Sequence, residues 1–396
     1  MTPPFERLHP AVRHHVVNSL GWRSLRPLQE RAIDPILAGR HVLLGAPTAG
    51  GKTEAALLPL LSRMVDERWS GLSVLYVCPL RALLNNLLPR AQSYARLLGR
   101  EAAIWHGDVS QRERKAILRD PPDLLLTTPE SIEAMLMSRS VDAQRLFSPV
   151  RGVVVDEIHA FAGDDRGWHL LALLARLDEL TGRELQRIGL TATVGNPDWL
   201  VEWLACGGKN EREVVMTSPG GDQALDVSVD WVASVSNAAK VIASLHRGEK
   251  RLVFADSRAR VEELASALRG SGATVFVSHS SLSRDDRRAA ERAFSETRDC
   301  VIVATSTLEL GIDVGDLDRV IQVGAPRTVA SLLQRMGRTG RRAGAVRNCL
   351  FLATSEMELL QALALVRLLR ENWVEALVAP GQPANLVGQG ARSHSG

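Results

Sequence analysis

The sequence predicts an α/β protein with two tandem doubly wound parallel-sheet domains. The chain has 396 residues, more than one ordinary hydrophobic core holds. In both halves, short apolar runs rich in Val and Leu alternate with longer helical stretches, and strands that are apolar on both faces are typical of a parallel sheet. A polar, Gly-rich stretch at 207–223 separates the halves. We therefore predict domains at 1–215 and 216–378, followed by a disordered tail at 379–396.

The first half contains five strand-like runs. They are HVLLGA (41–46), SVLYVCP (73–79), DLLLTT (123–128), GVVVDE (152–157) and RIGLTAT (187–193). Helical patterns at 54–68 and 167–182 lie between them. This alternation predicts a doubly wound domain.

The second half repeats the alternation. Its expected strands are RLVFADS (251–257), ATVFVSH (273–279), CVIVATS (300–306), RVIQVGAP (319–326) and CLFLATS (349–355). Its expected helices are 258–270 and 284–296. The second domain should therefore have the same architecture as the first.

Composition sets the broad class. Hydrophobic residues make up 45% and charged residues 23%, as in ordinary globular proteins. No apolar run is long enough to span a membrane, and MTPPFERLHP lacks the features of a signal peptide, so we expect a cytoplasmic protein. The four cysteines are far apart in the sequence, which favours free thiols over zinc sites or disulfides. A net charge of +3 neither requires nor excludes a nucleic-acid partner.

The segment APTAGGKT (46–53) follows a predicted strand and precedes a predicted helix, as a phosphate-binding loop does. Its glycines let backbone N–H groups approach phosphate oxygens, while Lys52 reaches the β and γ phosphates and Thr53 offers a hydroxyl to magnesium. The alternative is a chance Gly-Lys-Thr turn. We predict binding of ATP and Mg²⁺. The loop residues are Ala46, Pro47, Thr48, Ala49, Gly50, Gly51, Lys52 and Thr53.

VVVDEIH (153–159) ends another buried strand with two carboxylates. Asp156 should hold the magnesium shell, usually through water, and Glu157 should polarise the attacking water as general base. A solvated Asp-Glu pair at a strand end is the alternative. His159 suits either a packed histidine or a contact that links the nucleotide to the other domain.

LRPLQERAI (25–33) precedes the phosphate loop. The amide of Gln29 can donate to and accept from one edge of adenine. Trp22 or Arg26 could stack on the base. An ordinary helix start after Pro27 explains the segment equally well.

QRMGRTGRR (334–342) carries four arginines far downstream. A solvated basic loop or a nucleic-acid patch are the alternatives to a catalytic role. With a phosphate loop upstream, we predict that Arg338 and Arg341, three residues apart, contact the γ phosphate of ATP, because the planar guanidinium grips phosphate oxygens in pairs. Gln334 should lie near the attacking water.

The order of these motifs, with CPLRALLNNL, TTPES, TAT and ATSTLELGIDVGD between them, resembles the superfamily 2 helicases over about residues 5–375. DEIH, LHP near the start, WHGD (105–108), HSSLSR (279–284) and QRMGRTGR are most similar to the Lhr-like (large helicase-related) ATP-dependent helicases. The resemblance implies two RecA-like motor domains. Because such helicases usually continue into winged-helix and further domains, we expect a chain truncated after the motor domains.

The resemblance also implies further site residues. Thr191 and Thr193 would couple hydrolysis to strand binding, Thr305 would touch a backbone phosphate, and Gly311 and Asp313 would lie at the nucleotide. Taken alone, the Thr128 segment also reads as a helix start. The implied nucleic-acid track comprises Pro79, Leu80, Arg81, Thr128, Pro129, Glu130, Ser257, Arg258, His279 and Thr305.

We therefore predict an ATP-dependent helicase or translocase that moves 3′ to 5′ on single-stranded DNA and unwinds DNA or RNA:DNA duplexes. A DEAD-box-like RNA helicase is the enzymatic alternative. A nucleic-acid clamp or scaffold with a vestigial ATPase is the alternative from another class. We expect a monomer; the sequence does not identify protein partners or the pathway, and DNA repair is one compatible role.

Overall fold

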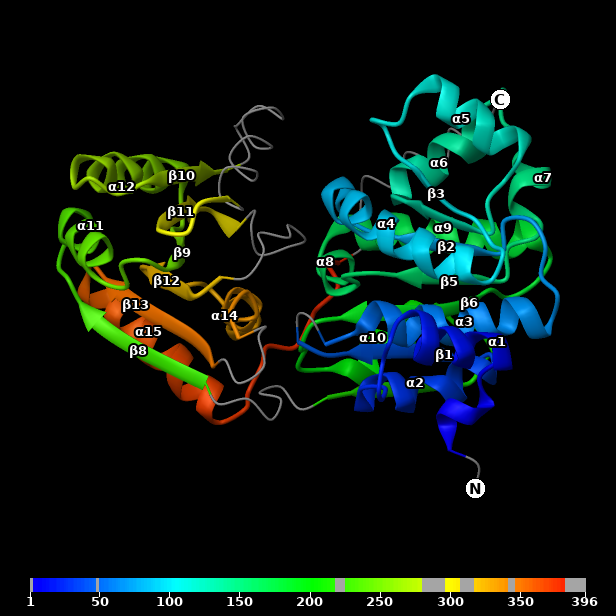
Figure 1. The fold of residues 1–396 in the computed structure, drawn as a ribbon, viewed down its shortest axis with the longest axis horizontal. Helices are drawn as coiled ribbons and strands as arrows, with labels where there is room; N and C mark the ends of the chain where they lie inside the picture. The colour runs from blue at the N-terminus through cyan, green and yellow to red at the C-terminus, as the bar shows by residue number, and fades with distance from the viewer. Residues whose placement is uncertain are drawn as a thin grey trace. The chain divides into compact units, whose positions relative to one another are not determined.

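The computed structural model describes residues 3–47, 50–217, 225–279, 296–306, 317–340 and 346–381. These residues form two compact units, each built around a parallel sheet (Figure 1). Unit 1 contains Met1–Ala46, Gly50–Thr217 and Ala376–Gly396, and unit 2 is built mainly from Ser218–Glu375. The predicted fold class is confirmed.

In the described part of unit 1, seven parallel strands follow the order β3-β4-β2-β5-β6-β1-β7. They are β1 (His41–Gly45), β2 (Val74–Val77), β3 (Ala102–Trp105), β4 (Leu124–Thr127), β5 (Gly152–Val155), β6 (Gln186–Thr191) and β7 (Arg212–Met216). Successive residues of a strand point to opposite faces, so Leu44 joins one hydrophobic cluster and Leu43 the other. The sheet is therefore buried on both sides, as the apolar runs predict.

Helices cover both faces of this sheet. One cluster contains side chains from α2, α3 and α4, and the other contains side chains from α6 to α10. No helix in the described residues is long and apolar enough to cross a membrane. The helices are η1 (Pro4–Arg7), α1 (Pro10–His14), η2 (His15–Ser19), α2 (Pro27–Leu37), α3 (Lys52–Asp66), α4 (Arg81–Leu97), α5 (Gln111–Arg119), α6 (Pro129–Met137), α7 (Ala143–Phe147), α8 (His159–Ala162), α9 (Asp165–Thr181) and α10 (Pro197–Ala205).

In the described part of unit 2, six parallel strands follow the order β10-β11-β9-β12-β13-β8. They are β8 (Leu225–Trp231), β9 (Lys250–Phe254), β10 (Val275–Ser278), β11 (Cys300–Ala304), β12 (Arg319–Val323) and β13 (Arg347–Ala353). The described helices are α11 (Val235–Ser244), α12 (Arg258–Gly270), α14 (Val329–Met336) and α15 (Glu356–Arg370). The helix expected at 284–296 lies almost wholly outside the described residues.

Three strands were missed by the sequence reading: β3, β7 and β8. Each lies at an edge of its sheet. An edge strand is covered on fewer sides, so it does not need a continuous apolar run. β7 lies inside the stretch 207–223 expected as the join, and it pairs with β1 as part of the first sheet.

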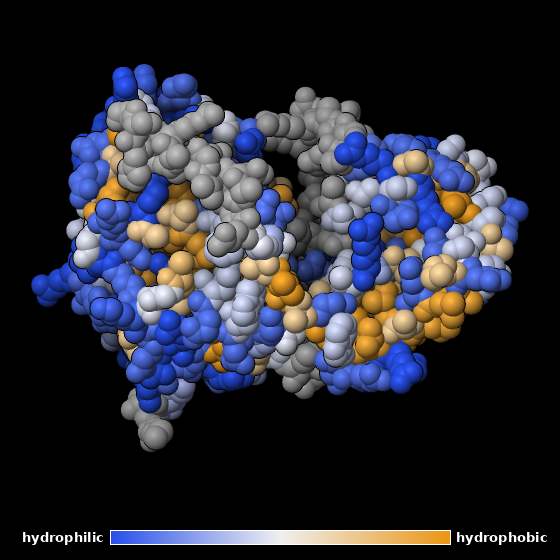
Figure 2. Space-filling view, turned by 180° about the vertical axis from the view of Figure 1, so that it is seen from behind, coloured by the Kyte–Doolittle hydropathy of each residue, from blue (hydrophilic) through white to orange (hydrophobic). Residues whose placement is uncertain are grey.

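The outer face of α15 is apolar. Met357, Leu360 and Leu363 are spaced three residues apart and are 63%, 62% and 49% exposed. Figure 2 shows hydrophobic surface gathered on the side of unit 2 that α15 covers. The helix therefore has apolar side chains on its outer as well as its buried face.

After α15 the chain packs against unit 1. Asn196 donates from Nδ2 to the carbonyl of Leu377 over 2.8 Å and accepts from its N–H over 2.7 Å. Trp168 donates to the carbonyl of Pro380 over 3.2 Å. Residues 376–381 therefore belong to unit 1, although the sequence assigns them to the second domain and the tail. Residues 382–396 of the expected tail lie outside the described residues.

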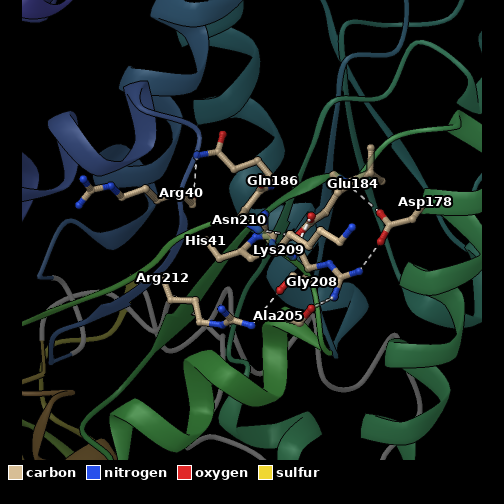
Figure 3. Close-up of polar contacts among 12 residues, drawn as sticks. Arg40, His41, Asp178, Glu184, Gln186, Ala205, Gly208, Lys209, Asn210 and Arg212 are labelled. Carbon is tan, nitrogen blue, oxygen red and sulfur yellow. Dashed lines mark hydrogen bonds and ion pairs between the residues drawn. The ribbon is translucent and has the colours of Figure 1, made fainter.

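A buried polar cluster holds the amino ends of β1 and β6 together (Figure 3). His41 is fully buried; its Nε2 lies 2.7 Å from Glu184 Oε1, and its Nδ1 accepts from the N–H of Arg187 over 3.1 Å. The Arg187 guanidinium, 3% exposed, bonds to Asp178 and to the carbonyls of Leu204 and Ala205. Because a buried polar group left unpaired is costly, this cluster fixes the strands that carry site residues at their other ends.

His41 should make unit 1 sensitive to acid. Burial lowers the pKa of His41 below its ordinary value, so below about pH 6.5 the unfolded chain binds a proton that the folded chain does not. Stability should therefore fall as pH falls through this range. We expect His41→Gln to lower the thermal midpoint near neutral pH but to reduce its drop between about pH 7.5 and about pH 5.5. An equal drop in both proteins would exclude His41 as the source.

Candidate nucleotide site and nucleic-acid track

The predicted motifs of unit 1 gather at one edge of its sheet. All strands are parallel, so the loops that follow them leave from the same edge. The phosphate loop follows β1, the Asp-Glu pair follows β5, and Thr191 ends β6, which lies between them. The loops after β2 and β4 lie farther along the same edge. Ligands of open α/β sheets bind at this carboxyl edge.

The phosphate loop is shaped by two of its residues. Lys52 begins α3 and donates from Nζ to the carbonyl of Ala46 over 2.7 Å. Gly51 has φ +80°, a conformation that favours glycine. The Lys52 ammonium is thus held beside Ala46, the first residue of the loop. Thr48 and Ala49 lie outside the described residues.

Gln29 reaches the phosphate loop from α2. Its side chain is 4% exposed; Oε1 accepts from the N–H of Arg26 over 2.9 Å, and Nε2 donates to the carbonyl of Gly51 over 3.4 Å. The Arg26 side chain also lies beside Gly51. Trp22, by contrast, packs against the hydrophobic cluster of the N-terminal helices. Of the two stacking candidates, the structure places Arg26 at the loop.

The acidic pair after β5 is held by hydrogen bonds. The hydroxyl of Tyr76, on the neighbouring strand β2, donates to Asp156 Oδ2 over 2.7 Å. The N–H of Glu157 donates to Asp156 Oδ1 over 2.9 Å. Glu157 has φ +50°, which is uncommon for a residue with a side chain and is often found at functional sites.

The donors at this point fit magnesium. Tyr76 lies close to Thr53 as well as to Asp156, so the predicted ligands Thr53 and Asp156 both lie near one hydroxyl. Burial and the neighbouring Glu157 carboxylate raise the pKa of Asp156 to about 6, because two carboxylates close together in a buried place disfavour each other's charged form. Hard oxygen donors are those Mg²⁺ prefers, and it usually keeps several waters and phosphate oxygens. No cluster of three or more His, Cys, Asp or Glu side chains forms a metal site among the described residues.

His159 connects the acidic pair to β6. Its Nε2 lies 3.5 Å from Glu157 Oε2, and its Nδ1 lies 3.1 Å from Thr191 Oγ1. Burial and the Lys52 ammonium lower the pKa of His159 to about 4, so the ring is neutral near pH 7. Thr191 is fully buried and its carbonyl accepts from the N–H of Ala46 over 3.3 Å. Thr193, 7% exposed, lies two residues beyond β6.

The predicted track residues of unit 1 divide by exposure. Leu80, Arg81 and Glu130 are exposed, while Pro79, Thr128 and Pro129 are buried. Arg81 forms an ion pair of 3.0 Å with Asp108. Thr128 does begin α6, but its hydroxyl contacts Ser131 Oγ at 3.1 Å instead of capping the backbone. Among the predicted track residues of unit 1, the exposed side chains of Leu80, Arg81 and Glu130 are therefore the ones that a nucleic-acid strand could reach.

The predicted track residues of unit 2 follow adjacent strands. Ser257 and Arg258 follow β9, His279 follows β10 and Thr305 follows β11. Ser257 accepts from the N–H of Arg260 and so caps α12, whereas Arg258 is exposed. Parallel pairing brings these positions to one edge of the second sheet.

The arginine motif begins at the end of α14. Gln334 lies in the last turn of that helix, and Arg338, 4% exposed, follows it. Arg335 is buried against the ring of Phe254, with its guanidinium carbon 4.8 Å from the ring centre. Gly340 has φ +70°, and a Cβ there would lie 2.8 Å from Arg347. Arg341, Gly311 and Asp313 lie outside the described residues.

Two residues of this edge were missed by the sequence reading. Tyr76 contacts Asp156, and Arg166 contacts the track loops. A polar hydroxyl inside the otherwise aliphatic run SVLYVCP was the available signal for Tyr76. No sequence signal marks Arg166, because its partners are distant in the chain.

Comparison with known proteins agrees with this arrangement. The DEAD/DEAH box helicase model matches residues 26–199, and the helicase conserved C-terminal domain model matches residues 234–343. The chain belongs to the DEAD/DEAH-type superfamily 2 helicases. The resemblance to the superfamily 2 helicases drawn from the motifs is thereby confirmed, and the relatives described next confirm its Lhr-like character.

Relatives of this helicase core carry Lhr names. The Lhr helicase/probable uracil glycosylase of Mycolicibacterium smegmatis is 32% identical across 92% of this chain and 28% of its own length. The ATP-dependent helicase Lhr-Core of Methanocaldococcus jannaschii is 32% identical across 81% of this chain and 41% of its own length. The structure of Mycobacterium smegmatis helicase Lhr bound to ssDNA and AMP-PNP superposes with a TM-score of 0.82 at 33% identity, covering 98% of this chain and 53% of that one. The chain thus spans about half or less of the length of these relatives.

Proposed function

We propose that this chain is an ATP-dependent helicase core that couples ATP hydrolysis to movement along single-stranded DNA. The observation that carries the proposal is the connected set at the carboxyl edge of unit 1: Lys52, the Asp156–Glu157 pair, His159 and Thr191. Structural ion pairs rarely combine a phosphate loop, a strained glutamate and a histidine bridge in one place.

Each residue of the set has a role in hydrolysis. Lys52 would leave the Ala46 carbonyl for the β and γ phosphates of ATP. Glu157 would take the proton of the attacking water. Thr53 and Asp156 would hold Mg²⁺, which when bound offsets charge on the phosphates.

Further residues complete the nucleotide site in this proposal. Gln29 and Arg26 would contact the adenine side, because both already lie against the phosphate loop. From unit 2, Gln334 would orient water, and Arg338 and Arg341 would neutralise the γ phosphate. Gly311 and Asp313 are proposed at the ribose on the family resemblance alone.

His159 and Thr191 would couple the site to the rest of unit 1. A neutral ring that directs its Nε2–H toward Glu157 accepts the Thr191 hydroxyl at Nδ1. A change in Glu157 contacts during hydrolysis would therefore alter the loop after β6, which contains Thr193.

The single-stranded nucleic acid would be bound by the exposed track residues. Leu80, Arg81 and Glu130 in unit 1, and Arg258 in unit 2, are exposed at strand-carboxyl edges. DNA is favoured over RNA because the solved Mycobacterium smegmatis relative is described as bound to ssDNA. Movement 3′ to 5′ is the polarity that the resemblance implies.

ATPase stimulation tests the choice of strand. We expect single-stranded DNA to raise the ATPase rate of the chain by about 10-fold or more, because strand binding should favour the hydrolysis-competent state. Single-stranded RNA of the same sequence should stimulate less. Stimulation by RNA alone would replace the DNA proposal with the RNA helicase alternative, and a strand-binding protein without ATPase activity would support the clamp.

A further inference from the structure

Arg166 joins two loops of the predicted nucleic-acid track. It lies at the start of α9, where its N–H donates to the cap residue Asp164 over 3.0 Å. Its guanidinium donates from Nη2 to the carbonyl of Pro79 over 3.1 Å. It also donates to Glu130 Oε1, from Nη2 over 2.7 Å and from Nε over 3.1 Å. One side chain therefore ties the loop after β2 to the first turn of α6, the helix that follows β4.

The same residue rests on the helix that carries His159. The Arg166 guanidinium carbon lies 5.4 Å from the ring centre of Phe161, which is fully buried in α8. Gly167 makes the approach closer still, because a Cβ there would lie 2.4 Å from the Phe161 carbonyl oxygen and 2.9 Å from the Trp203 ring. α9 can therefore start against α8 only with glycine at this position.

These contacts form a continuous path through one unit. It begins at the Glu157–His159 contact, passes along α8 to Phe161, crosses to Arg166, and ends at Pro79 and Glu130. The residues at its far end adjoin or belong to the exposed part of the track.

We propose that Arg166 is a positioning residue that transmits movement of α8 at the nucleotide site to the two strand-contacting loops. The inference rests on the proposed function, since it assigns a device to the coupling of hydrolysis and strand binding. It adds a role for a residue outside the phosphate loop, the Asp-Glu pair and the predicted track.

The small stability contribution expected of the Arg166–Glu130 pair favours a role in positioning the two segments over a role in stabilising the fold. The Arg166–Glu130 pair is exposed, with side chains 38% and 53% accessible, and such pairs contribute little to stability. The guanidinium nevertheless makes three directional contacts at once, which a lysine ammonium on a flexible stem cannot reproduce in the same geometry. The arrangement therefore matters chiefly for where the loops lie.

The competing role for Arg166 is direct contact with a strand phosphate. The two roles differ in their response to lysine. A phosphate contact tolerates lysine, and its loss lowers the salt slope of strand binding by about one. If Arg166 positions the loops, both Arg166→Lys and Arg166→Ala should lose the DNA stimulation of the ATPase. The salt slope of DNA binding should stay unchanged, because the number of neutralised phosphates is the same.

The experiment compares Arg166→Ala and Arg166→Lys with the wild type and with Arg176→Ala. Arg176 lies on the same helix, is exposed, and contacts Met137 Sδ rather than Pro79 or Glu130, so this variant controls for loss of charge. The measurements are ATPase rates with and without saturating single-stranded DNA, strand affinity over a range of salt concentrations, and thermal midpoints.

We expect both Arg166 variants to keep the strand-independent ATPase rate within about 2-fold and to lose about 10-fold of the stimulation, with an unchanged salt slope.

Wild-type stimulation in both would overturn the proposal. Rescue by lysine with a reduced slope in alanine would make Arg166 a phosphate ligand instead. If Arg166→Ala fails to fold, Arg166→Lys alone decides between these outcomes. Absence of stimulation in the wild type and in Arg176→Ala would refute the proposed function itself, a result distinct from a loss confined to Arg166.

Discussion

Replacing Glu157 with glutamine should abolish ATP hydrolysis and leave ATP binding intact. The amide is nearly isosteric with the carboxylate but cannot take a proton from water. General-base catalysis contributes about 10²- to 10⁴-fold to a rate, so kcat should fall by roughly that factor. The Kd for a fluorescent ATP analogue should change little, because in the proposed site Lys52 and the loop backbone would provide most of the phosphate contacts.

The matched control is Glu179→Gln, which makes the same chemical change at an exposed position of α9. It should hydrolyse ATP like the wild type. Equal turnover by Glu157→Gln and the wild type would refute the active-site assignment. Loss of ATP binding in Glu157→Gln would instead show that the side chain mainly holds the loop structure around φ +50°.

The sequence predicts the interior of each sheet better than its edges. All ten predicted strands are present, and all but β10 lie inside their sheets, where strands buried on both faces need unbroken apolar runs. β8 alternates polar and apolar residues (LDVSVDW), and β7 begins with two charged residues (REVVM), so both resemble loops in a single sequence. β3 is apolar but is only the short run AAIW between Glu101 and His106. The charged residues at the start of β7 also make the stretch 207–223 resemble a linker, although it contains this strand.

Local motifs predict site residues that are contiguous in the sequence. They miss residues whose contacts join segments that are far apart in the sequence. The phosphate loop and the Asp-Glu pair are contiguous in sequence, and their strand context is visible there. Tyr76 and Asp156 are 80 residues apart, and Arg166 and Pro79 are 87 apart. Their contacts depend on the strand order, in which β5 lies beside β2. Local sequence patterns do not predict that order.

Replacing Arg338 with alanine should give the other large effect. Arg338 lies just beyond α14 and is 4% exposed, so it is held firmly within unit 2. An arginine that stabilises the transferring γ phosphate contributes about 10³- to 10⁵-fold in rate. We therefore expect kcat for ATP hydrolysis to fall by about that factor in Arg338→Ala, measured with saturating single-stranded DNA.

Strand affinity decides between this role and a basic nucleic-acid patch. A catalytic arginine acts on ATP, so the Kd for single-stranded DNA and its salt slope should stay close to wild type in Arg338→Ala. The reverse result, lost strand binding with retained hydrolysis, would establish the patch. Because truncating a buried arginine also risks the packing of unit 2, Arg338→Lys gives a second reading. Lysine keeps the charge and most of the stem but cannot bind two phosphate oxygens in one plane. If Arg338 acts on the γ phosphate, Arg338→Lys should therefore fold like the wild type and still hydrolyse ATP slowly.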